Sequence, residues 1–465
     1  MATAVSDMLG MIELISLIAF AVAMFACASK PSWRFNLAHP FALYAIVFAV
    51  YEFGPLVIWS LTDHPEQGTK WAVVGMALLA LLGVAAGVRL GQGQVTEYRL
   101  GQHRNRLPQG SLNSTLIVTG IIAAITAIRY GILISEGSIN THTNPYIIQP
   151  TVFVSVFIVF ADQGRFAVIL LLGFVCRSSS DKARPALFRL LVLYTIILET
   201  LLMVCSETRP ALTGALCFLI AWRCATQKAV SLRTLGVSAA GILIGALVIQ
   251  QVRLLDLDAI RLSDSPVAAA GYAILAGSGR LFDGGAGDAA LAVTSRVGDG
   301  PRLSGTIWES LASGGQGSGG AATWYTLQSM VPRVMQREKA PTVPLDVYTE
   351  RTLGLAESDG CLTSYGYAFM EGGWPAVFIV HALLGLGLAL ISKKAMAGLN
   401  PLWWLACAFG WEVVLQMETE LLPESLSALR CVLVYGVILQ LCSMGRRQDK
   451  VSAAHKTPMT SMMVR

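Results

Sequence analysis

Runs of about 20 apolar residues recur along most of this 465-residue chain. A run of that length crosses the hydrocarbon core of a bilayer as one helix, and soluble domains do not contain many of them. Hydrophobic residues make up 54% of the chain and charged residues only 14%. These proportions exclude an ordinary soluble enzyme, a nucleic-acid-binding protein and a disordered scaffold. We therefore predict an all-α polytopic membrane protein.

The apolar runs predict about eleven transmembrane helices and one long connection between the eighth and the ninth. The approximate helix spans are 8–28, 38–62, 71–90, 113–132, 150–176, 188–208, 209–222, 234–252, 366–391, 401–420 and 428–445. The chain divides accordingly into helices one to eight (1–252), a large periplasmic loop (253–365), helices nine to eleven (366–445) and a cytoplasmic tail (446–465).

Basic residues predict the orientation, because Lys and Arg in short loops stay on the cytoplasmic side. One alternating set of loops, together with the C-terminal tail, contains 20 of them, whereas the opposite short connections contain only Lys70 and Arg209. The N-terminus is therefore expected outside and the C-terminus inside. The first apolar run follows Asp7 rather than a basic stretch, so we expect it to be retained and not cleaved as a signal peptide.

The long outer connection is rich in polar and turn-forming residues. Residues 253–364 contain nine Lys or Arg, twelve Asp or Glu and sixteen Gly, which indicates a partly folded, water-facing cap. Apolar stretches at 267–275 and 324–334 predict short amphipathic helices within it. The sequence GQGSGG at 315–320 matches the pattern GxGxxG, but no strand precedes it, so we interpret it as a turn. Histidine and cysteine spacings indicate no metal site.

Several residues point to function or close packing inside the membrane. Glu412, Gln416 and Glu420 are spaced by four, so they share one face of the tenth helix, and Glu412 lies too deep for its side chain to reach the interface. This face is a candidate cavity lining. Gly83 and Gly87 are also spaced by four, which predicts close contact between helices.

The densest group of cations outside the membrane is VPRVMQREKAP at 331–341, which includes Arg333, Arg337 and Lys339. Arginine binds phosphate oxygens in two-point geometry and lysine adds a compact charge, so the group suits a diphosphate at headgroup level. The alternative is a surface that faces solvent or lipid headgroups.

The chain resembles a known family in its architecture and in about thirty residues of motif. A Pro-Arg pair precedes a lysine and a proline (Pro332, Arg333, Lys339, Pro341), and the glycine-rich stretch YGYAFMEGGWP at 365–375 leads into the next helix. The turn ETRPALTG at 207–214 is similar to the family's arginine-containing helix start. Together these features resemble the Wzy-type O-antigen and exopolysaccharide polymerases. The chain departs from the commoner pattern because Ala340 separates the lysine from the proline.

The resemblance implies transfer of a growing glycan from a polyprenyl diphosphate to a sugar hydroxyl of a lipid-linked repeat unit, at the outer face of the bacterial inner membrane. The reaction needs no cofactor, metal ion or nucleic acid. Arg209 and Arg333 would bind the departing diphosphate, and Glu371 would take the acceptor proton. The alternative for Glu371 is that it stabilises the N-terminus of the helix that starts at Pro375. Further substrate-binding candidates are Arg337, Lys339, Arg280, Arg296 and Glu412.

The expected partners are the lipid-linked oligosaccharide, membrane lipids, a chain-length regulator and a flippase. Two other functions stay open from the sequence. An O-antigen ligase would use the same donor with a lipid A core acceptor. A transporter or flippase for a lipid-linked sugar would line its translocation path with the same buried charges.

Overall fold

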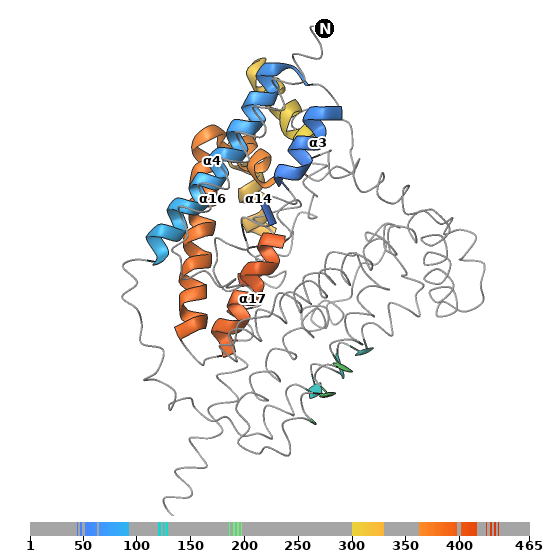
Figure 1. The fold of residues 1–465 in the computed structure, drawn as a ribbon, viewed down its shortest axis with the longest axis vertical. Helices are drawn as coiled ribbons and strands as arrows, with labels where there is room; N and C mark the ends of the chain where they lie inside the picture. The colour runs from blue at the N-terminus through green and yellow to red at the C-terminus, as the bar shows by residue number, and fades with distance from the viewer. Residues whose placement is uncertain are drawn as a thin grey trace, which may run out of the picture.

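The computed structural model describes residues 52–62, 65–92, 300–329, 362–397 and 401–415, with isolated helical positions at 44–48, 120–128, 186–197 and 425–436. Every regular element in these stretches is a helix. They are α3 (Gly54–Thr62), α4 (Gln67–Gln92), a helix over 300–312, α14 (Ala321–Ser329), α16 (Ser364–Ala397) and α17 (Pro401–Leu415) (Figure 1). The described part of the chain is therefore all-α, as predicted.

Two of the described helices, α4 and α16, are long and apolar enough to cross a membrane. They correspond to the predicted helices 71–90 and 366–391, while α17 lies within the predicted helix 401–420 and α3 within 38–62. The predicted helices 8–28, 150–176, 209–222 and 234–252 lie outside the described residues.

Helices α4 and α16 pack closely along their length because glycines face the contact. A Cβ atom added to Gly83 would lie 2.6 Å from the carbonyl oxygen of Phe378, and one added to Gly87 would overlap the carbonyl oxygen of Ala382. The predicted close packing at these glycines is therefore confirmed. Gly241 and Gly245, which the sequence also spaces by four, lie outside the described residues.

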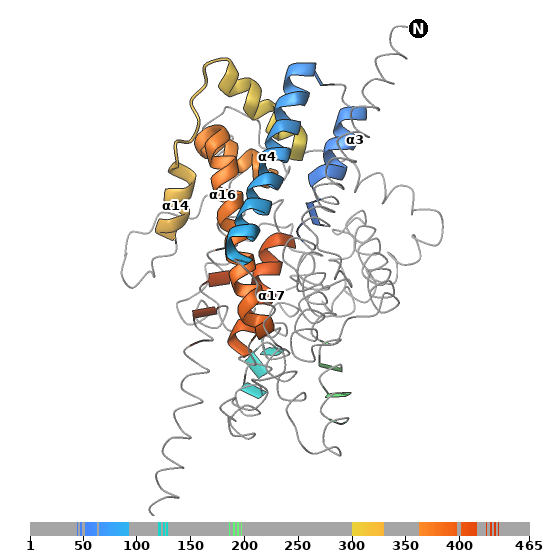
Figure 2. The ribbon, with the colours of Figure 1, turned by 60° about the vertical axis from the view of Figure 1, so that its left-hand side comes forward.

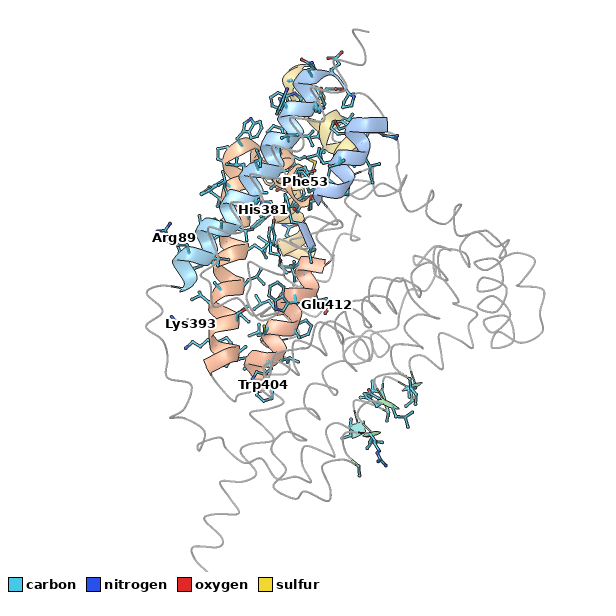
Figure 3. All side chains as sticks on the ribbon, in the orientation of Figure 1. Phe53, Arg89, His381, Lys393, Trp404 and Glu412 are labelled. Atoms are coloured by element: carbon cyan, nitrogen blue, oxygen red, sulfur yellow. The ribbon has the colours of Figure 1, made fainter. Side chains whose placement is uncertain are left out.

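The same contacts give the relative direction of the two helices. Going down α4, Gly75 lies against Trp374, Gly83 against His381 and Gly87 against Leu386. Residue numbers rise together, so α4 and the main part of α16 run parallel. Their basic residues Arg89 and Lys393 consequently lie toward the same end of the bundle (Figure 3). This agrees with the predicted topology, in which both helices cross from outside to inside.

α16 is two helices rather than one, because its backbone breaks at Gly372 and Gly373. Gly373 has φ 67° and ψ −158°, a conformation that is essentially restricted to glycine. Ser364 Oγ lies 3.1 Å from His381 Nε2, 17 residues later, whereas a continuous helix would separate these residues by about 25 Å. Residues 364–371, which we call the half-helix, therefore fold back along the helix formed by 374–397. Pro375 fits this second start because a first-turn residue needs no N–H donor.

The half-helix is buried on all sides, in contrast to the helix that follows it. Every residue from 364 to 371 is buried, whereas Ile379 and Leu383 on the following helix are 53% and 62% exposed. The helix over 300–312 covers the adjoining end of the bundle, where Thr69 donates a 2.7 Å hydrogen bond to Glu309. Figure 2 shows α14 on the opposite side of α16 from α3. The predicted apolar helix near 324–334 corresponds in part to α14.

Candidate functional site

A glycine-rich turn over 313–320 connects the helix at 300–312 to α14. Gly314, Gly319 and Gly320 have positive φ angles of 94°, 57° and 87°, which L-residues with side chains rarely adopt. No strand precedes the turn, which follows directly on a helix, so the interpretation of GQGSGG as a turn is confirmed.

The turn caps the end of the half-helix. The last carbonyl groups of a helix have no partner within the helix and need one from outside. The Ser318 N–H donates to the carbonyl oxygen of Met370 at 3.0 Å, and the Ser318 Oγ lies 3.2 Å from the same oxygen. A stretch of the predicted outer loop is therefore bound directly to the glycine-rich motif at 365–375.

Glu371 lies at this junction and binds two elements at once. Ser318 Oγ donates to Glu371 Oε1 at 2.6 Å, and the backbone N–H of Thr323 donates to Glu371 Oε2 at 3.1 Å. Thr323 is in the first turn of α14, where a carboxylate satisfies a free N–H and interacts favourably with the helix dipole. The alternative role considered for Glu371 thus has a structural counterpart, although the stabilised helix is α14 and not the one that starts at Pro375.

Three aromatic rings lie together near the same junction, of which Phe369 is buried and Trp308 and Trp374 are partly exposed. Trp308, Phe369 and Trp374 lie with ring centroids 5.3 to 5.9 Å apart, in tilted and edge-to-face pairs. Trp374 is 37% exposed, immediately after the glycine break. Tryptophan of this kind is enriched where a membrane helix reaches the interface. The rings and Glu371 therefore belong to one end of the apolar bundle.

A second group of polar side chains, Glu52, Ser364 and His381, is buried among the helices. Glu52 Oε1 accepts hydrogen bonds from the backbone N–H of Ser364 at 3.1 Å and from its hydroxyl at 2.7 Å. The same hydroxyl lies 3.1 Å from His381 Nε2, and His381 Nδ1 lies 2.7 Å from the carbonyl oxygen of Val377. Glu52 and His381 are fully buried, and Ser364 is 1% exposed. His381 lies on α16, where that helix contacts Gly83 of α4 (Figure 3).

Neighbouring hydroxyl groups complete the start of the half-helix. Thr363 Oγ1 accepts the N–H of Gly366 at 3.0 Å, which is the geometry of an N-cap residue. Ser304 Oγ lies 2.6 Å from Thr363 Oγ1, so the helix at 300–312 also contacts this cap. The N-terminus of the half-helix is thereby held inside the bundle by side chains from both sides.

Only two of the predicted site residues, Glu371 and Glu412, fall within the described stretches. Glu412 is partly exposed on α17, on the opposite side of the described helices from Arg89 and Lys393 (Figure 3). Its predicted neighbours Gln416 and Glu420 lie outside the described residues. The predicted cations also lie outside them: Arg209, Arg280, Arg296, Arg333, Arg337 and Lys339.

The sequence interpretation did not single out Glu52 and Ser364, and it treated His381 as one of several scattered histidines. A usable signal was present, because Glu52 and His381 each interrupt an apolar run of membrane-spanning length. The sequence alone does not show that these side chains meet, because only the fold-back at Gly373 brings Ser364 beside His381.

No protein-family model, curated protein or solved structure matches this chain. Among the described residues, no group of three or more His, Cys, Asp or Glu side chains is placed to hold a metal ion.

Proposed function

We propose that this protein is a membrane glycosyltransferase that polymerises polyprenyl-diphosphate-linked oligosaccharide repeat units into O-antigen or exopolysaccharide. The reaction would take place at the outer face of the bacterial inner membrane. The proposal starts from the resemblance of the motifs at 207–214, 332–341 and 365–375 to Wzy-type polymerases.

The observation that carries the proposal is the junction at Glu371. It brings the glycine-rich motif at 365–375 into direct contact with residues 313–323 of the large polar segment. A polymerase of this class needs its water-facing segment fixed against the membrane helices, because the diphosphate and the lipid tails enter from the membrane while the sugars remain in water. The hydrogen bonds of Ser318 and Thr323 supply such a fixed contact.

The proposed chemistry divides between this junction and the cationic motifs. Formation of the glycosidic bond releases a proton from the acceptor hydroxyl and negative charge on the departing diphosphate. Arg209 and Arg333, with Arg337 and Lys339, are the proposed diphosphate ligands, and Glu371 is the proposed base. Arg280, Arg296 and Glu412 are further proposed substrate contacts.

Surface glycan from a deletion strain tests the proposal. A polymerase predicts loss of long chains while lipid A core capped with a single repeat unit remains. Total loss of capping would instead indicate a ligase or a flippase. Restoration of long chains by the wild-type gene is the control, and long chains that persist in the deletion strain would rule the proposal out.

A second candidate function is a transporter or flippase for a lipid-linked sugar. The interrupted α16 and the buried Glu52, Ser364 and His381 favour it, because transporters often place broken helices and buried ionisable groups beside their substrate path. Polymer formation by the purified protein from lipid-linked repeat units separates the two, since a transporter makes no glycosidic bond.

A further inference from the structure

The buried group of Glu52, Ser364 and His381 is separate from the Glu371 junction and is not used by the proposed transfer chemistry. None of the three residues is more than 1% exposed. Ionisable side chains inside membrane helices are rare, and by default they indicate a functional pathway. The geometry of their hydrogen bonds allows the hydrogens to be counted.

His381 Nδ1 lies 2.7 Å from the carbonyl oxygen of Val377. A carbonyl oxygen only accepts, so Nδ1 carries a hydrogen. Whether Nε2 also carries a hydrogen then depends on its contact with Ser364 Oγ.

Ser364 makes two contacts with one hydroxyl hydrogen. Its Oγ lies 2.7 Å from Glu52 Oε1 and 3.1 Å from His381 Nε2. Each contact needs one hydrogen, and the hydroxyl supplies one of them. The other must be bound to the Glu52 carboxyl group or to His381 Nε2.

We infer that Glu52, Ser364 and His381 form a proton-exchange site, in which one proton is shared between the carboxyl group and the imidazole through the serine hydroxyl. In the first form, protonated Glu52 donates to Ser364 Oγ, and the Ser364 hydroxyl donates to neutral His381. In the second, the His381 imidazolium donates to Ser364 Oγ, and the Ser364 hydroxyl donates to the Glu52 carboxylate.

Passage from the first form to the second breaks the O–H bond of Glu52 and forms a new O–H bond at Ser364. The original O–H bond of Ser364 breaks, and an N–H bond forms at His381 Nε2. Atoms and charge balance, and the group as a whole stays neutral. A buried group that stays neutral avoids the large desolvation penalty of an isolated charge.

Neighbouring backbone groups stabilise the second form as well. The Ser364 N–H, at the start of the half-helix, donates to Glu52 Oε1 at 3.1 Å and favours the carboxylate. The Val377 carbonyl accepts from Nδ1 and favours the imidazolium. Both forms therefore satisfy every contact in the chain of hydrogen bonds.

The glutamate end is the side on which a proton would enter or leave. The histidine end is closed by the Val377 carbonyl, which has no hydrogen to pass on. The buried hydroxyls of Tyr44 and Tyr365 lie close enough to Glu52 for electrostatic interaction. Among the described residues, neither hydroxyl has a hydrogen-bond partner, so both are candidates for the next group in the path.

Solid-state NMR of the full-length protein in lipid bilayers tests the inference without any substitution. The ring nitrogens of His381 are assigned through their coupling to the Val377 carbonyl carbon, and the Glu52 carboxyl carbon through its proximity to Ser364. We expect protonated Glu52 with Nδ1–H neutral His381, or carboxylate with imidazolium, or exchange between them. A carboxylate with a neutral histidine, or a protonated carboxyl with an imidazolium, would overturn the inference.

The variant Glu52→Gln provides a second test. The amide oxygen takes the place of Oε1 as acceptor of the Ser364 N–H, and the amide has no acidic proton to pass to His381 through the serine hydroxyl. A buried imidazolium without the Glu52 carboxylate beside it is costly. We expect His381 to be held in the neutral Nδ1–H form, with complete loss of any imidazolium signal. An imidazolium signal that persists in Glu52→Gln would show that the proton of His381 does not come from Glu52.

Discussion

Glu371 and Ser318 are 53 residues apart in the chain, and Ser318 Oγ donates a 2.6 Å hydrogen bond to Glu371 Oε1. The bond joins a turn of the large polar segment to the last residue of the half-helix, directly before the glycine break. With the contact from Thr323 to the other carboxylate oxygen, it fixes Glu371 from two sides. The proposed base and the segment proposed to face the substrate therefore hold each other in place.

The first prediction separates a catalytic role of Glu371 from a structural one. Glu371→Gln keeps the size of the side chain and removes the basic oxygen, so we expect polymer formation to fall by about 10²- to 10⁴-fold. Ser318→Ala removes one hydrogen bond and leaves the carboxylate, which should lower stability by about 1 kcal/mol and activity only a few-fold. Both are measured as polymer formed from purified lipid-linked repeat units. Near-normal polymer from Glu371→Gln would leave the residue with its capping role alone.

The second prediction concerns the contact between α4 and α16. Gly87→Ala places a methyl group against the carbonyl oxygen of Ala382, so the helices must move apart, and we expect a loss of about 1 to 3 kcal/mol in stability. Gly387→Ala is the matched control, because nothing lies within 4 Å of its added Cβ. The control should be neutral or stabilising by about 0.5 to 1 kcal/mol. Equal unfolding temperatures of the two variants in detergent would contradict the close packing.

The third prediction concerns the serine between Glu52 and His381. Ser364→Ala removes the hydroxyl that both side chains contact, and we expect it to cost about 1 to 3 kcal/mol in stability. Ser392→Ala is the control, because Ser392 is also buried on α16 and its hydroxyl makes a weak contact of 3.9 Å with Cys407 Sγ. We expect the control to unfold close to the wild type. Thermal unfolding of the two variants checks this. An equal loss in both would show that the hydrogen bonds of Ser364 with Glu52 and His381 add no stability.

The sequence was sufficient for the class of fold and for the contacts that depend on local spacing. Apolar runs predicted α4, α16 and α17, and the spacing of Gly83 and Gly87 predicted the close helix contact. Hydropathy did not predict the fold-back inside α16, because the half-helix is short and directly precedes the apolar run of the spanning helix, so it is taken as the start of that helix. The pair Gly372 and Gly373 before Pro375 was the available local signal.

The candidate site was less predictable, because its contacts join parts of the chain that are distant in sequence. Glu371 was identified from its motif, but its contact with Ser318 depends on a turn that docks from a distant part of the chain. Ser364 and His381 meet only because residues 364–371 reverse direction. Side chains brought together by chain reversal leave no spacing pattern in the sequence.

The fourth prediction tests the topology, using the parallel direction of α4 and α16. Truncated fusions to a reporter that is active only in the periplasm should be active after Glu66 and after Ser318. Fusions after Gln92, at the end of α4, and after Arg446, beyond the last predicted helix, should be silent. Basic residues mark both places as cytoplasmic. Different activities after Glu66 and Ser318 would contradict the parallel arrangement, and activity reversed at all four sites would invert the protein in the membrane.

The last prediction concerns the proposed diphosphate ligands Arg209 and Arg333. A lipid diphosphate in a partly dehydrated groove needs more than one cation, and the point charge of lysine does not reproduce the two-point contact of arginine. Loss of one such contact costs about 2 to 4 kcal/mol, or roughly a thirty- to thousandfold drop in rate. Arg333→Lys should therefore be severely impaired although the charge is kept. Arg333→Ala combined with Arg209→Ala should show less than the sum of the two single effects, because both residues serve one leaving group. The measurement is polymer formed from purified lipid-linked repeat units at matched protein levels. Near-normal rates for Arg333→Lys and Arg333→Ala would remove this motif from the site and leave it as a surface that faces lipid headgroups.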